Sequence, residues 1–204
     1  MYKRQDISAV YSGACAYSSF TDYMGNCGTG NSVGLGTQGA TAAMSYAFDS
    51  GFTLAGGISS TPTGLLTEEG TDTFGLEAAY SKDAYAVAVA YADAETTTYW
   101  GINGTYAFDF ATVTAGVESA DPDGSATATG FMVGLSFPEV GAGSLDVGMG
   151  TTGNFTSSDT EYYIYEASYA YPVNDGITIT PGVYIRETSG DDQTGIAVKT
   201  SFSF

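Results

Sequence analysis

Hydrophobic and polar residues alternate along most of this chain with a period of two, in segments of about ten residues. In the final segment Ile196, Val198 and Phe202 share one face, and Gly195 and Ala197 share the other. Successive side chains of a β-strand point to opposite sides, so this pattern is typical of strands whose faces meet different surroundings. Eleven such segments follow residue 40, and Ile7 to Tyr11 forms a weak twelfth. The pattern predicts an all-β protein.

The two faces of the predicted strands differ in charge. The central part of the apolar face carries no Asp, Glu, Lys or Arg. A charge on a lipid-facing strand costs about 2–4 kcal/mol at the bilayer midplane for Arg or Lys, and less for acids. Alternation also fits a soluble sandwich, whose apolar face meets a second sheet. The opposite face is small and polar, and we predict that it lines a pore with the charged residues Glu77, Glu118, Asp146, Glu166, Arg186 and Lys199.

The connections between segments alternate between short and long. Short connections lie at 49–51, 81–83, 109, 138–143 and 174–176, and long ones at about 13–39, 60–72, 92–97, 119–125, 150–160 and 187–193. Outer-membrane barrels have short periplasmic turns and longer outer loops. Aromatic rings gather beside the short connections, where an inner girdle is expected: Phe48, Phe52, Tyr80, Tyr85, Phe108, Phe110, Phe137, Tyr171 and Phe204. We therefore predict a transmembrane, antiparallel, up-and-down β-barrel with about eleven to twelve strands in this chain.

One position departs from the strand pattern. Pro181 lies inside a predicted strand, where it removes a hydrogen bond of the ladder, and Gly182 follows it. A bulge or kink at this point is the expected accommodation.

The composition of the 204 residues excludes several classes of function. Five basic residues stand against 23 acidic ones, giving a formal net charge of -18, which argues against a nucleic-acid partner. Histidine is absent, so Ser-His-Asp and Cys-His catalysis and imidazole metal ligands are excluded. No apolar run reaches the length of about 18 residues that a membrane helix needs. We expect no cofactor and no resident metal.

Carboxylates give little support to an enzyme. Glu118 and Glu166 could form an acid–base pair, but acids spread over separate strands fit a wet channel better. The segment 121–124 hints at a calcium loop but lacks the later bidentate Glu, so we interpret it as a turn.

The N-terminal region differs from the remainder. Residues 1–5 hold two of the basic residues and no apolar signal core follows, so we interpret them as a truncated or non-native start. Residues 6–204 are then the C-terminal part of a barrel. Cys15 and Cys27 lie in a stretch rich in Gly, Ser and Asn, where we expect a disulfide that staples a loop in an oxidising compartment.

The C-terminal third of the chain carries a family resemblance. The segment Tyr171 to Tyr184, a short acidic loop and a strand ending at Phe204 resemble the C-terminus of cyanobacterial outer-membrane porins, and Gly134 to Val140 resembles a strand and Phe-Pro turn of the same proteins. These are called iron-uptake porins and are related to carbohydrate-selective porins. The match is good over 130–204 and looser over 6–129. The resemblance implies a larger barrel that forms a homotrimer, an S-layer homology domain before it, and an assembly signal at Phe202 and Phe204.

These observations predict an outer-membrane porin in contact with membrane lipid. It would be a passive channel for small hydrophilic solutes and inorganic ions with a mild cation preference, and the resemblance adds iron and carbohydrates as candidate cargo. A secreted or surface β-sandwich acting in adhesion is the alternative from another class. A twelve-stranded autotransporter translocator needs a helix in the pore, for which residues 6–39 are too rich in glycine.

Overall fold

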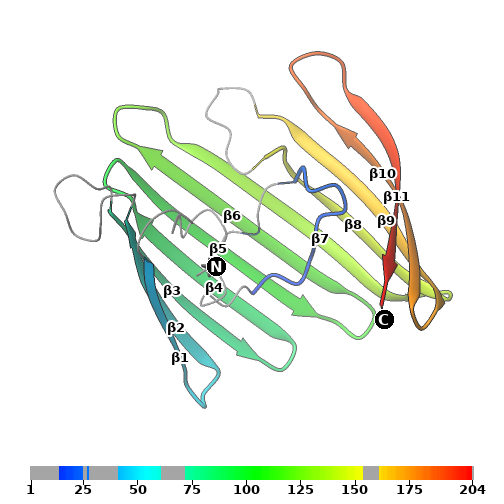
Figure 1. Cartoon of the computed structure of the whole chain (residues 1–204), viewed down its shortest axis with the longest axis horizontal. Coiled ribbons are helices and arrows are strands. Elements are labelled where there is room, and N and C mark those ends of the chain that lie inside the picture. The colour runs from blue at the N-terminus through cyan, green and yellow to red at the C-terminus, as the bar shows by residue number, and fades with distance from the viewer. Residues whose placement is uncertain (1–13, 25–26, 28–40, 61–71, 154–160, 204) are drawn as a thin grey trace, which may run out of the picture.

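The fold is a single antiparallel sheet whose strands follow one another in chain order (Figure 1). The computed structural model describes residues 14–24, 27, 41–60, 72–153 and 161–203. The eleven strands are β1 (Thr41–Ala47), β2 (Phe52–Ser60), β3 (Asp72–Lys82), β4 (Tyr85–Asp93), β5 (Thr97–Ala107), β6 (Thr112–Pro122), β7 (Ala128–Val140), β8 (Gly143–Thr151), β9 (Tyr163–Asn174), β10 (Ile177–Arg186) and β11 (Gln193–Phe202). The all-β, antiparallel prediction is confirmed. The weak twelfth segment and residues 1–5 lie outside the described residues.

The sheet is strongly curved, and β1 and β11 form its two edges (Figure 1). Each strand is paired with its neighbours in the chain, as expected for hairpins joined by alternating short and long connections. Among the described residues, no helix has the length and apolar character needed to cross a bilayer.

The apolar face of the sheet is the exposed face. In β4, Val89 and Tyr91 are 50% and 47% exposed, whereas Ala88 and Ala90 are each 1% exposed. Apolar side chains of this face are exposed at both edges of the sheet as well, where Met44 is 74% and Ile196 is 79% exposed. A soluble sandwich would cover these side chains with a second sheet. No such layer is present in the described part of the chain, so the apolar face is available to hydrocarbon.

Aromatic rings cluster beside the short turns, as the sequence predicts. The rings of Phe52 and Tyr80 are 4.5 Å apart across β2 and β3, and those of Tyr80 and Tyr85 are 5.8 Å apart. Tyr106 and Phe108 form a similar pair, at 4.5 Å, beside the next short turn. Aromatic rings beside the short turns are typical of the interfacial girdle of a membrane barrel.

The expected bulge at Pro181 is not found. Pro181 pairs with Val198 in the regular register of β10 and β11, and the register with β9 is the same at Ile179 and at Gly182. The irregularity lies instead between Ile177 and Thr178, directly after the short turn. A proline needs no bulge where its missing N–H costs the sheet a single ladder bond.

Candidate functional site

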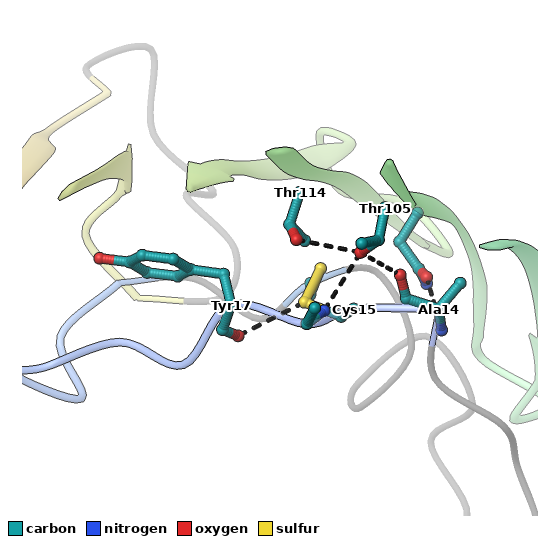
Figure 2. Close-up of a disulfide and its surroundings, with 8 residues drawn as sticks. Ala14, Cys15, Tyr17, Thr105 and Thr114 are labelled. Atoms are coloured by element: carbon teal, nitrogen blue, oxygen red, sulfur yellow. Dashed lines mark hydrogen bonds between the residues drawn. A yellow bond between two sulfur atoms is a disulfide. The ribbon is translucent and has the colours of Figure 1, made fainter. Parts of the chain in front are cut away.

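Residues 14–24 together with Cys27, called here the inner segment, lie on the polar face of the sheet (Figure 1). The segment is attached to β5 at its start: the Ala14 N–H donates to Asn103 Oδ1 at 3.1 Å, and Thr105 Oγ1 donates to the Ala14 carbonyl at 2.6 Å. Figure 2 shows Thr105 between Ala14 and Thr114, whose hydroxyl lies 2.9 Å from that of Thr105. The inner segment therefore begins on one wall and crosses toward β9.

Glu166 of β9 holds the middle of the inner segment. Its Oε1 accepts hydrogen bonds from the Tyr17 hydroxyl at 3.0 Å and the Phe20 N–H at 2.7 Å. Its Oε2 accepts from Ser19 Oγ at 3.1 Å, and from the N–H and hydroxyl of Thr21 at 3.0 and 2.7 Å. Glu166 is 3% exposed, so these donors replace the water that an ionised carboxylate otherwise needs.

The phenol of Tyr17 remains a donor to this carboxylate. Burial raises the pKa of Tyr17 well above its usual value, and the nearby charge of Glu166 raises that pKa further. A phenol is protonated at physiological pH even at its ordinary pKa, and the raised pKa of Tyr17 extends the alkaline range over which its hydroxyl remains a donor.

Glycines on the polar face make room for the side chains of the inner segment. A Cβ added at Gly134 or Gly148 would overlap the side chain of Tyr17, and one at Gly182 would overlap the ring of Phe20. Among the described glycines, Gly116 lies in the same way under the backbone of Cys27, and Gly150 lies under Met24. The small residues of this face thus serve the fit of the inner segment.

A small apolar core lies between the inner segment and the wall. Tyr17 and Met24 pack with Met132 of β7 and Ile164 of β9, and the two cysteines pack against this cluster. Cys15 and Cys27 form a disulfide with Cα atoms 6.0 Å apart, and this disulfide closes the loop that carries Tyr17 and Phe20.

We expect Gly134→Ala to destabilise the protein by about 1–3 kcal/mol, because the added methyl carbon would overlap the Tyr17 side chain, whose own Cβ lies 2.7 Å away. Urea unfolding in lipid vesicles measures the loss. Gly56→Ala on the apolar face is the matched control, since its Cβ meets the flexible end of Leu76 at 3.1 Å and the Gly75 carbonyl oxygen at an ordinary contact distance of 3.6 Å. Equal stability of the two variants would contradict this account of the fit.

The charged residues predicted to line a pore all occupy the polar face, in different settings. Register aligns Glu77 with Ala90, Gly101 and Glu118 across β3 to β6, and both glutamates are buried. Asp146 of β8 is half-buried, in register with Ser136 and Ser168. Arg186 and Lys199 lie near aromatic rings of the inner segment. Phe202 is exposed at the end of β11, and Phe204 lies outside the described residues.

Sequence reasoning did not predict that Tyr17, Phe20 and Tyr23 contact the polar face of the sheet. The available signal was the placement of Met132 and Ile164 on the otherwise polar face, because large apolar residues there require a cover. No group of His, Cys, Asp or Glu in the described residues is arranged to hold a metal ion.

A profile of Gram-negative porins matches residues 5–193 of the chain. The chain belongs to the Gram-negative porin family. No curated protein is significantly similar to it in sequence. Among solved structures, a triple mutant of the Rhodopseudomonas blastica porin is similar, with a TM-score of 0.59 and 19% identity, over 80% of this chain and 55% of that one. A double mutant of the same porin gives a TM-score of 0.59 and 20% identity, with the same coverage.

These likenesses establish the fold of this porin chain, and its family is one of channels without catalytic activity. Gram-negative porins sit in the bacterial outer membrane, which places the exposed apolar face in lipid. The comparisons support the porin part of the sequence resemblance; its cyanobacterial, iron and carbohydrate parts gain no support from them. The chain spans 55% of the length of the Rhodopseudomonas blastica porin variant.

Proposed function

We propose that this porin is a passive aqueous channel whose narrow part is formed by the inner segment. The observation that carries the proposal is the attachment of the inner segment to Glu166 and to β5 on the polar face, opposite an apolar face whose large side chains are exposed. An inner segment fixed in this way reduces the cross-section of the lumen by a constant amount. Ions and small hydrophilic solutes would pass the remaining space by diffusion.

We propose further that residues 6–204 form part of a larger barrel. Every neighbouring pair of strands is antiparallel, so β1 and β11, ten steps apart in the sheet, run in the same direction. Antiparallel closure therefore requires an odd number of additional strands between them, in agreement with the even strand numbers of single-chain outer-membrane barrels. The coverage of 55% of the Rhodopseudomonas blastica porin supports this view.

Charge on the polar face favours cations. Asp146 is half-buried there, and Asp22 of the inner segment is exposed on the same side. Arg186 and Lys199 are the basic residues that the described part of this face carries. Carboxylates at a constriction raise the local concentration of cations and repel anions.

In planar bilayers with a KCl gradient, we expect a reversal potential that corresponds to about a two- to fourfold preference for potassium over chloride. Asp146→Asn should lower this preference, and Asp175→Asn, at the exposed short turn between β9 and β10, should leave it unchanged. A reversal potential of the opposite sign would refute the proposed cation preference.

Solute class and assembly rest on other grounds. Iron, carbohydrates and a homotrimeric state follow from the resemblance of residues 130–204 to cyanobacterial porins, and we propose them on that basis. Liposome-swelling rates with sugars of increasing size, and cross-linking of the protein in detergent, test the cargo and the assembly.

A further inference from the structure

The two basic residues on the polar face of β10 and β11 each lie against an aromatic ring of the inner segment. The Arg186 guanidinium carbon is 4.5 Å from the centre of the Tyr23 ring. The Lys199 ammonium nitrogen is 5.1 Å from the centre of the Phe20 ring. Both separations are within the range of about 6 Å over which a ring face attracts a cation.

Independent contacts hold both rings in place. Phe20 is 5% exposed, its ring lies over Gly182, and its N–H donates to Glu166. The carbonyl of Tyr23 accepts a hydrogen bond from the Gly153 N–H at 2.8 Å, and its ring lies 6.1 Å from that of Tyr184. Phe20 is therefore held by contacts other than that with Lys199, and Tyr23 is held through its backbone and beside the Tyr184 ring.

An aromatic ring that covers a cation weakens the attraction between that cation and a passing anion. Tyr23 is 44% exposed and its ring lies over the half-buried Arg186, so the ring replaces part of the hydration shell of this cation. Lys199 is itself exposed beside the buried ring of Phe20, so its ammonium group stays accessible. Arg186 is half-buried, and its Nε is buried without a hydrogen-bond partner in the described part of the chain. The charge stays in the wall, but an anion is held farther from it, and Coulomb attraction falls with separation.

We propose that Tyr23 is a specificity-determining residue that covers Arg186 and so suppresses anion passage. This inference rests on the proposed channel function. It assigns the inner segment a second task, because the same segment that narrows the lumen also sets which sign of charge the wall presents.

The test measures reversal potentials of the reconstituted protein in a KCl gradient. Tyr23→Leu removes the ring and keeps an apolar side chain. We expect this variant to lower the cation-to-anion permeability ratio about twofold, since chloride then approaches the Arg186 guanidinium more closely. An unchanged ratio in this variant overturns the proposal.

A double-substitution cycle separates covering from simple widening. In an Arg186→Met background the Tyr23→Leu change should no longer alter the permeability ratio. An effect of equal size with and without the cation would mean that the ring acts only through pore width, and would refute the proposal. If the unsubstituted protein carries no current, the channel function fails; if it conducts and the ratio does not change, only the covering role fails.

Discussion

Glu166→Gln is expected to raise the single-channel conductance about twofold, because it releases the inner segment from the wall. The amide keeps the size of the side chain but turns one of the two acceptor oxygens into a donor, which then faces hydroxyl and N–H groups of residues 17–21. Leaving buried donors without acceptors costs about 1–3 kcal/mol each. Planar-bilayer recordings measure the conductance, and swelling assays should show a larger size limit for solutes.

Glu139→Gln is the matched control for this variant. Glu139 lies near the end of β7 at a short turn and is exposed, so its conversion removes the same charge without touching the inner segment. Its conductance should equal that of the unsubstituted protein. If Glu166→Gln also conducts at the unsubstituted level, Glu166 does not hold the constriction.

Reduction of the Cys15–Cys27 disulfide is also expected to make the inner segment more mobile. The bond links residues separated by 12 positions, and a cross-link of this span contributes about 3 kcal/mol in the chain-entropy account. Treatment with a small thiol, which is oxidised to its own disulfide as the two cysteines become thiols, should increase the current noise and the mean conductance. The recordings should be made on one bilayer before and after addition.

The variant with both Cys15→Ser and Cys27→Ser controls for effects of the thiol on the bilayer. It should show the loosened behaviour from the start and no response to the reagent. A completed reduction, verified by counting free thiols, that leaves the conductance of the unsubstituted protein unchanged would show that the hydrogen bonds to Glu166 suffice alone.

The strands could be predicted from the sequence because their determinants are local. Alternation over about ten residues gives each strand and its faces, and the short connections give the pairing of neighbours. Pro181 was the exception: the sequence marks it as a disturbance, yet it pairs with Val198 on one side, and the register with β9 on the other side is the same at Ile179 and at Gly182.

The site could be predicted only in part. Glu166 was recognised as a residue of the polar face, but its partners Tyr17 and Phe20 are 149 and 146 positions away in the chain, and no local pattern records such pairs. The two cysteines marked residues 15–27 as a stapled loop without indicating where that loop lies. Met132 and Ile164 were the remaining clue, since both interrupt the small, polar character of their face.

The glycines beneath the inner segment have a consequence for redesign of the channel. Gly148 lies under the Tyr17 hydroxyl, so the volume allowed at position 148 depends on the volume used at position 17. A bulkier residue at 148 combined with a smaller one at 17 would keep the interface filled while moving bulk from the loop to the barrel. The diameter of the channel and the stability of the protein could then be adjusted separately, through paired substitutions at two positions that are remote in sequence.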